Sequence, residues 1–241
     1  MAKNRRMRPL SDSVLMEGRN VWTVNANPGV AVRGESLRKF RGVEHRRWDP
    51  NRSKLGAGIL RTRNNPSDLL PRPGSTVLYL GAGHGTTVSH LHDHLCGASN
   101  RHRGRLVAVD LAPRCLRDLT HLAETRKGLV PVLGDARKFD AWGVLIPSRV
   151  DWLFQDVAQA GQVEIFLSAV RRFLSKDGIG LLSLKAASER HRDGGDADIF
   201  AAAIEQLSDE VELIEHINLT GFEDQHALFV IRRRWESARA A

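Results

Sequence analysis

The chain has 241 residues, of which 41% are hydrophobic and 27% are charged. This composition is typical of one large globular α/β domain with at most a small additional domain. No run of 18 or more apolar residues occurs and no apolar stretch follows the basic N-terminus, so we expect neither a membrane span nor a secretory signal. Two cysteines, Cys96 and Cys115, are too few for a disulfide framework. We expect them to be small buried hydrophobic residues in a reducing compartment.

Positive charge is concentrated in the first quarter of the chain. Residues 1–63 contain 15 Lys and Arg against 5 Asp and Glu, whereas residues 64–241 contain 21 against 23. A basic segment beside a nearly neutral body suggests a polyanionic partner, most simply a nucleic acid, that approaches from one side. The alternative is a solubilising tail. The arginines continue beyond the tail into patterned sequence, which favours a nucleic-acid partner.

The N-terminal part is predicted to contain an arm and a small domain. Residues 1–13 are basic and are expected to form a disordered arm. Residues 14–52 are expected to form a small β-rich domain. Within it, short β-forming runs at 21–24 and 30–33 flank an Asn/Pro/Gly cluster, which predicts a hairpin. The stretch from 40 to 50 is polar and rich in arginine.

Residues 53–241 are predicted to form the main domain. A short helix over 53–60, with Ser53 as its N-cap, opens it. Strands and helices then alternate, with strands expected at 75–80, 105–109, 129–133, 150–154, 179–184, 211–217 and 227–233. Apolar strands that alternate with amphipathic helices predict a parallel sheet covered on both faces. The last two strands have no helix between them and should pair as an antiparallel hairpin at one edge. We therefore expect a Rossmann-like α/β sheet of about seven strands.

Glycines and acids recur at the ends of four consecutive predicted strands. The run Gly81–Gly85 follows the first strand, where small residues let the backbone approach a ligand and a helix start offers N–H donors. Asp110, at the second strand end, is placed to accept ribose hydroxyls, and Asp135, after the third, to accept an adenine amine. Asp156 follows the fourth. Each aspartate alone is more typical of a cap or turn, but together they favour a nucleoside-bearing methyl donor, with a nicotinamide dinucleotide as the alternative.

Five segments carry a family resemblance. They are WDPNRSKLGA at 48–57, VLYLGA at 77–82, GTTVSH at 85–90, GDAR at 134–137 and DVAQ at 156–159. Together they resemble the fibrillarin family, from about residue 20 to residue 234, and the absence of a long Gly/Arg-rich N-terminal tract resembles its archaeal form. The resemblance implies a class I methyltransferase fold and an S-adenosyl-L-methionine-dependent RNA ribose 2′-O-methyltransferase that works on rRNA, and possibly tRNA, in a box C/D guide ribonucleoprotein.

The resemblance also implies the site residues. The catalytic set is Lys54, Asp156, Lys185 and His226. The positions that bind S-adenosyl-L-methionine are Gly81, Ala82, Gly83, Thr86, Thr87, Asp110, Leu111, Asp135, Ala136, Asp156, Val157, Ala158 and Gln159.

Methyl transfer to a ribose requires an aligned hydroxyl and an acceptor for its proton. Lys185 is the expected acceptor, since a neutral lysine amine is favoured by burial and by a second ammonium nearby, here Lys54. Asp156 is expected to orient Lys185 or to hold the sulfonium end of the donor. Lys54 is expected to contact the phosphate beside the target nucleotide, and His226 to hydrogen-bond the ribose.

No metal site is expected. His90, His92 and His94 lie on one predicted helix, and His90 and His94 have an i, i+4 spacing that can bind a metal. However, no third ligand is evident and methyl transfer needs no metal, so these histidines are expected to have a solvated or capping role.

The implied partners are the box C/D guide RNA with its target rRNA or tRNA, a Nop-domain scaffold protein and a kink-turn-binding protein, with no membrane. The expected location is the cytoplasm of a prokaryotic cell, or the nucleolus only in a eukaryote. Two alternative functions remain: a protein glutamine methyltransferase, and a largely structural subunit of the RNA-modifying particle.

Overall fold

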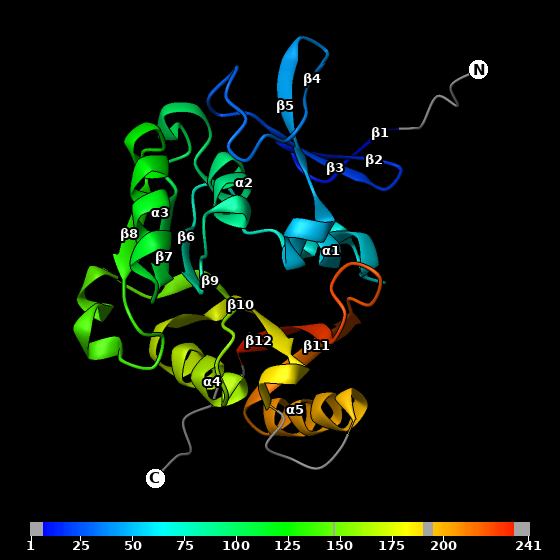
Figure 1. Ribbon diagram of the computed structural model, residues 1–241, viewed down its shortest axis with the longest axis vertical. Helices are drawn as coiled ribbons and strands as arrows, with labels where there is room; N and C mark the ends of the chain where they lie inside the picture. Colours follow the sequence, from blue (N-terminus) through cyan, green and yellow to red (C-terminus); the bar gives the residue numbers. More distant parts are fainter. Residues whose placement is uncertain (1–6, 147, 190–194, 234–241) are drawn as a thin grey trace.

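The computed structural model describes residues 7–146, 148–189 and 195–233, which form two β-sheets with helices packed against them. A small N-terminal sheet lies beside a large central sheet, and α1 (Lys54–Arg61) lies between the two (Figure 1). The small sheet is antiparallel with the order β1-β2-β3-β5-β4. Its strands are β1 (Met7–Pro9), β2 (Val14–Glu17), β3 (Asn20–Val24), β4 (Leu37–Phe40) and β5 (Val43–Trp48).

The prediction of a disordered arm over residues 1–13 is wrong for its second half. β1 pairs with β2, with Arg8 opposite Met16. The main-chain N–H of Leu10 donates to the carbonyl oxygen of Val14 at 2.8 Å, and the Leu10 side chain is buried in the core. One apolar residue in a tight turn thus anchors a basic segment. Residues 1–6 of the predicted arm lie outside the described residues.

The predicted hairpin of 21–24 with 30–33 is also wrong. β3 is a strand, but it pairs with β2 and β5, and residues 30–33 form a loop. The Glu35 carboxylate accepts hydrogen bonds from the main-chain N–H groups of Val32 at 2.9 Å and Arg33 at 2.6 Å. Those donors are therefore bound locally by a side chain and are not available to a sheet.

The arginine-rich stretch forms β5 because one of its arginines is buried. Arg46 is fully buried and donates from Nε to Asp93 Oδ2 at 3.0 Å and from Nη2 to Ser89 Oγ at 3.1 Å, both on α2 (Thr86–Leu95). Asp93 also accepts from Arg126 Nε at 3.1 Å. Burial alone would raise the pKa of Asp93, but the hydrogen bond with His92 and the charges of the two arginines outweigh it and lower that pKa to about 2. This buried ionic cluster joins the small sheet to the main domain.

The large sheet confirms the predicted seven-stranded α/β architecture. Its order is β11-β12-β10-β9-β6-β7-β8, parallel except that β12 is antiparallel to both of its neighbours. The hairpin β11–β12 occupies one edge, as predicted. The strands are β6 (Thr76–Leu80), β7 (Arg105–Asp110), β8 (Leu129–Leu133), β9 (Val150–Gln155), β10 (Leu174–Lys185), β11 (Val211–Asn218) and β12 (His226–Arg233).

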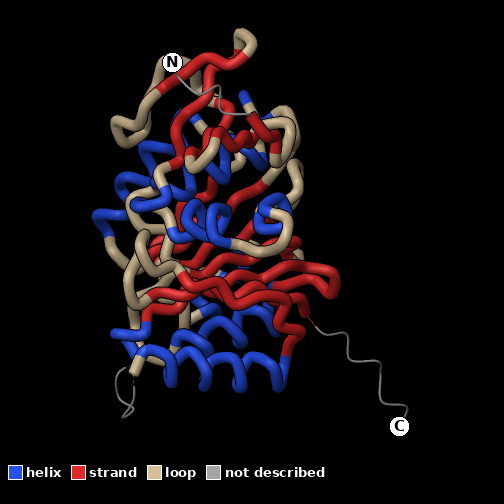
Figure 2. The backbone as a smooth tube through the Cα atoms, turned by 90° about the vertical axis from the view of Figure 1, so that its right-hand side faces the viewer, coloured by secondary structure: helices blue, strands red, loops and turns tan. Residues whose placement is uncertain are grey.

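Helices cover both faces of this sheet (Figure 2). Residues of β6 alternate between two cores: Leu78 and Leu80 pack with α4 (Gln162–Phe173) and α5 (Asp196–Glu210), whereas Val77 and Tyr79 pack with α1, α2 and α3 (Pro113–Thr125). This two-sided burial explains why the strands are almost continuously apolar.

Two smaller expectations concern caps and cysteines. Ser53 caps α1 as predicted, because its Oγ accepts the main-chain N–H of Gly56 at 3.1 Å. Cys96 and Cys115 are free and buried, as predicted, and burial raises the pKa of the Cys96 thiol to about 12. Among the helices that the structure describes, none is both long and apolar enough to cross a membrane.

Candidate active site

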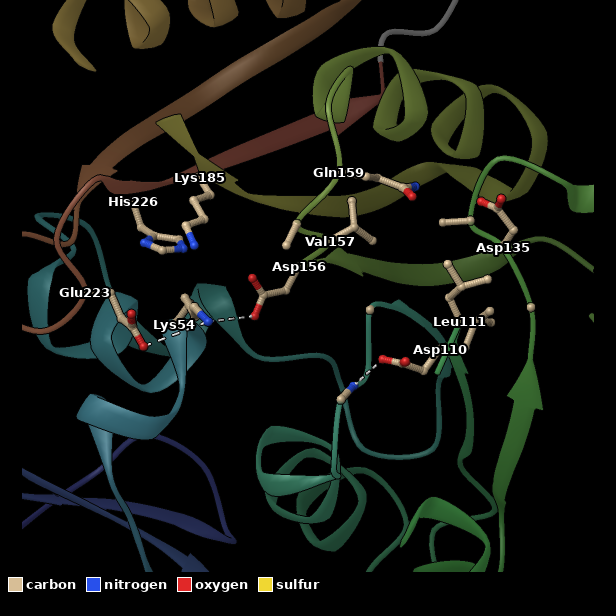
Figure 3. A pocket seen from close by; sticks show the side chains of 16 residues that line it. Lys54, Asp110, Leu111, Asp135, Asp156, Val157, Gln159, Lys185, Glu223 and His226 are labelled. Atoms are coloured by element: carbon tan, nitrogen blue, oxygen red, sulfur yellow. Dashed lines mark hydrogen bonds and ion pairs between the residues drawn. The ribbon is translucent and has the colours of Figure 1, made fainter. Parts of the chain in front are cut away.

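A cavity of about 590 Å³ opens at the carboxyl ends of the parallel strands, where open α/β sheets bind ligands. It brings together all four residues of the predicted catalytic set and most of the predicted donor-binding set (Figure 3). The predicted residues that line it are Lys54, Gly81, Gly83, Asp110, Leu111, Asp135, Ala136, Asp156, Val157, Ala158, Gln159, Lys185 and His226.

Lys54 reaches the cavity from the first turn of α1. The cap residue Ser53 fixes this turn, and its hydroxyl is also hydrogen-bonded to Trp48 Nε1 and to the Thr87 hydroxyl, both at 2.9 Å. The Lys54 ammonium lies 3.4 Å from Asp156 Oδ2 and 3.8 Å from Glu223 Oε1 (Figure 3). Asp156 was expected to orient Lys185, but the structure describes no hydrogen bond or ion pair between these two residues. Asp156 pairs with Lys54 instead.

Lys185 and His226 are neighbours because of strand pairing. Lys185 ends β10, His226 begins β12, and the two are directly opposite each other in the antiparallel register. His226 is 8% exposed, and its Nδ1 lies 2.9 Å from the carbonyl oxygen of Asp224. Because a carbonyl oxygen only accepts, Nδ1 carries a hydrogen, and in the neutral imidazole Nε2 is therefore the acceptor. The ring lies beside the Lys185 side chain (Figure 3).

The glycine-rich turn brings the backbone close to the end of β9. Gly81 has φ = +79°, and a Cβ atom there would lie 2.3 Å from the carbonyl oxygen of Asp156. Only glycine satisfies both conditions. Asp110 supports the same turn, since its carboxylate accepts the main-chain N–H groups of Gly83 at 2.7 Å and Ala112 at 2.9 Å. Each carboxylate oxygen can accept a further hydrogen bond, as binding of ribose hydroxyls would require.

Two residues define the predicted adenine end. Asp135 is held by the guanidinium of Arg137, with a shortest distance of 2.7 Å. Hydrogen bonds from the side chain and main chain of Arg137 lower the pKa of Asp135 to about 2, so the carboxylate is ionised at neutral pH. Leu111 lines the cavity and is 60% exposed, so it offers an apolar surface to a ligand.

Three predicted donor-binding residues do not line the cavity. Ala82 is buried in the core beneath the turn, and Thr87 is buried with its hydroxyl bonded to Ser53. Thr86 begins α2 and is outside the lining as well. The Thr87 hydroxyl instead joins the start of α2 to the cap of α1.

Three lining residues are absent from the predicted set: Val109, Gly134 and Glu223. Val109 and Gly134 stand next to predicted residues at strand ends, so the rule that placed Asp110 and Asp135 could have found them. Glu223 lies in the turn between β11 and β12 and has no periodic or spacing signal. Only the fold brings it to Lys54.

The histidines of α2 have a structural role, so the expectation that they are solvated or cap the helix is wrong. All three are buried. His90 stacks on Trp48 with ring centroids 4.9 Å apart, and His94 is hydrogen-bonded to the Ser13 hydroxyl and the Pro71 carbonyl, both at 2.7 Å. His92 bonds to the Lys127 carbonyl at 2.9 Å. Within the described parts of the chain, no group of three or more His, Cys, Asp or Glu residues could hold a metal ion.

The cavity therefore has two chemically different ends. The end formed by Gly81, Asp110, Leu111 and Asp135 offers carboxylates and an apolar surface, which suit a nucleoside. The other end carries the amines of Lys54 and Lys185 and the imidazole of His226, together with the carboxylates of Asp156 and Glu223 that hold Lys54. Amine and imidazole groups suit the removal of a proton.

Known proteins resemble this chain in both sequence and fold. The fibrillarin family model matches residues 11–235. The chain is 40% identical to a fibrillarin-like rRNA/tRNA 2′-O-methyltransferase of Thermococcus gammatolerans, over 88% of this chain and 90% of that protein. The fold is similar to Aeropyrum pernix fibrillarin in complex with natively bound S-adenosyl-L-methionine, with a TM-score of 0.78, 31% identity and coverage of 96% and 100% of the two chains. It is also similar to fibrillarin in a fibrillarin/Nop5p complex, with a TM-score of 0.76, 29% identity and coverage of 95% and 98%.

Proposed function

The chain belongs to the fibrillarin family, and on that premise we propose that it is an S-adenosyl-L-methionine-dependent RNA ribose 2′-O-methyltransferase that acts on rRNA and tRNA. The observation that carries this proposal is the convergence of Lys54, Asp156, Lys185 and His226 in one cavity. Four separate segments of the chain supply these side chains, and the same cavity holds a second end suited to a nucleoside.

The residues of that second end fit the donor. Gly81 lets the backbone lie close to the end of β9, and a side chain at this position would disturb Asp156. Asp110 and Asp135 supply side-chain oxygens as acceptors for ribose hydroxyls and an adenine amine. Exposed Leu111 would be covered by a bound adenine, which explains an apolar side chain at the rim. The solved fibrillarin with natively bound S-adenosyl-L-methionine supports this assignment.

The reaction transfers a methyl group from the positively charged sulfur of the donor to a ribose oxygen. The Lys185 amine removes the proton of the 2′-hydroxyl as the new bond to oxygen forms. His226, with Nδ1–H bound to the Asp224 carbonyl, holds Nε2 beside Lys185, where it can accept an N–H of the Lys185 amine and so keep the nitrogen lone pair directed at the hydroxyl. Lys54, held by Asp156 and Glu223, faces the flanking phosphate. Positioning by these groups supplies much of the rate, because the reacting atoms must be in line.

The proposed partners follow from charge and from the family. The exposed basic side chains of the small sheet include Arg38, Lys39, Arg41 and Arg47. Such contacts bind RNA phosphates without selecting a sequence. We therefore propose that the chain works in a box C/D particle in which a Nop-domain scaffold, a kink-turn-binding protein and a guide RNA select the target. The solved fibrillarin/Nop5p complex supports the scaffold. We also propose a cytoplasmic location, because the named relatives come from prokaryotes.

The decisive experiment measures single-turnover methyl transfer to guide-matched RNA in the reconstituted particle. We expect Lys185→Ala to bind the donor normally in calorimetry and to lose most of the transfer. Lys127→Ala, which changes an exposed lysine outside the cavity, is the control. Near-normal transfer by Lys185→Ala would remove this residue from the mechanism. Transfer to protein glutamine with none to RNA would contradict the proposed function itself.

A further inference from the structure

Gln162 makes an unusual pair of hydrogen bonds with the main chain of Lys185. It is the first residue of α4 and is completely buried. Its Oε1 accepts the main-chain N–H of Lys185 at 3.0 Å, and its Nε2 donates to the main-chain carbonyl of Lys185 at 3.1 Å. One side-chain amide thus binds both polar groups of the Lys185 backbone, at the point where β10 ends.

The same amide is itself fixed in place. Its Nε2 also donates to Glu189 Oε1 at 2.9 Å, so the orientation of the amide is set by a carboxylate that can only accept. Glu189 in turn accepts the main-chain N–H groups of Gln162 at 2.8 Å and Gly161 at 3.1 Å, at the N-terminus of α4. The amide has no freedom to rotate without breaking these bonds.

A second buried amide extends the network to the donor side. Gln155, the last residue of β9, is fully buried and donates from Nε2 to the main-chain carbonyl of Gln162 at 2.7 Å. Asp156 follows it directly in the chain. This bond uses the backbone of Gln162 and not its side chain, so the two halves of the network can be separated by mutation.

We propose that Gln162 is the positioning residue for the proton acceptor of the reaction: its side-chain amide fixes the backbone of Lys185 and so sets where the amine lies in the cavity. The inference rests on the proposed methyl-transfer function. At the end of β10 the strand no longer has a neighbour on the β9 side, because pairing with β9 stops at Leu182. The Gln162 amide supplies the hydrogen bonds that a neighbouring strand would otherwise make with the Lys185 main chain. The amine at the end of the long Lys185 side chain is placed accurately only if the main chain of Lys185 is itself fixed in position.

The test replaces the amide and leaves the rest of the network. Gln162→Met has similar length and no polar atoms, while its main chain still binds Gln155 and Glu189. We expect single-turnover methyl transfer in the reconstituted particle to fall roughly tenfold or more, since small displacements of reacting groups have large effects on rate. Donor affinity, measured by calorimetry, should change less than about threefold, because the donor end of the cavity is unaltered.

The double variant with Lys185→Ala distinguishes positioning from general damage. If Gln162 acts through Lys185, Gln162→Met should have no further effect in the Lys185→Ala background. If the rate losses of the two single variants multiplied in the double variant, the proposal would be overturned. A normal rate for Gln162→Met alone would also overturn it. Thr23→Val, which removes a buried hydrogen bond to His90 in the small sheet, is the control for lost stability and should keep the normal rate.

One further measurement keeps the test independent of activity. Amide exchange at Lys185 should be faster in Gln162→Met and unchanged in β6. If the unaltered particle failed to methylate RNA, the proposed function would fall, whereas unchanged exchange at Lys185 would overturn the role of Gln162.

Discussion

Replacing Gly81 by alanine tests whether the glycine-rich turn sets the position of Asp156. At φ = +79° an alanine costs about 1–2 kcal/mol of strain. In addition, its Cβ would lie 2.3 Å from the Asp156 carbonyl oxygen, whereas ordinary contact begins at 3.4 Å. The Asp156 main chain must therefore move by about 1 Å. It is bound to the Leu80 carbonyl at 2.8 Å, so the movement alters the end of β9 and cannot be absorbed by a flexible side chain. A displacement of this size at a reacting group can lower the rate about a hundredfold.

The control is Gly34→Ala, which has a similar φ of +73° and open space around the added Cβ. Strain alone should lower the melting temperature of both variants by roughly 2–8 °C. Only Gly81→Ala should also bind the donor more weakly in calorimetry and transfer methyl groups about a hundredfold more slowly at saturating donor. If Gly81→Ala showed the same loss of stability as Gly34→Ala but normal donor binding and rate, the close approach at Asp156 would have no functional importance.

Three further predictions concern single side chains and the partners. Asp135→Ala should weaken donor binding about tenfold in calorimetry through loss of a hydrogen bond to a charged group, and unchanged affinity would show that adenine lies elsewhere. Asp93→Asn removes the carboxylate that two buried arginines share, leaving Arg46 with its ion pair to Glu35 alone, and should lower the free energy of unfolding by about 3–5 kcal/mol. The pKa of Asp93 is lowered to about 2 in the folded protein. Its contribution to the free energy of unfolding is therefore present above the unfolded pKa near 4 and is lost as the pH falls toward 2. In urea titrations at different pH, the asparagine variant should lack this acid-sensitive part of the stability. The isolated chain should bind RNA weakly, with a steep salt dependence. The scaffold, the kink-turn protein and the guide RNA should together raise turnover at the nucleotide that the guide selects. Site-specific methylation by the chain alone would argue for a stand-alone enzyme.

The sequence was sufficient for the main sheet because its signals are local. Most strands from β6 to β12 contain an apolar run, and β11 alternates apolar with polar residues; each is bounded by turn residues or by a helix. Ser53 caps α1 through a bond to a residue only three positions away. The glycines and acids of the donor end are found from the same pattern, since the ends of parallel strands meet at one edge of a sheet.

The small sheet could not be predicted in the same way. β5 contains Arg46 at a core position, and polarity argues against a buried strand there. The burial is possible because Asp93, 47 positions later, supplies the compensating charge. Conversely, residues 30–33 have the composition of a strand, but the N–H groups of Val32 and Arg33 bind Glu35. In both cases a single polar contact outweighs the intrinsic preference of the residues.

The family resemblance named the four residues of the reactive end, but the tertiary structure decided their contacts. Lys185 and His226 meet because β10 and β12 pair in one particular register, and a shift by one residue would turn one side chain to the opposite face. Glu223 reaches the Lys54 amine from a turn, and Gln162 reaches the Lys185 main chain from a helix start. Neither segment shares a motif with the lysine that it contacts. Sequence patterns report which residues a segment buries, but the contacts between segments depend on strand register and on side-chain hydrogen bonds that form only once the sheet is assembled.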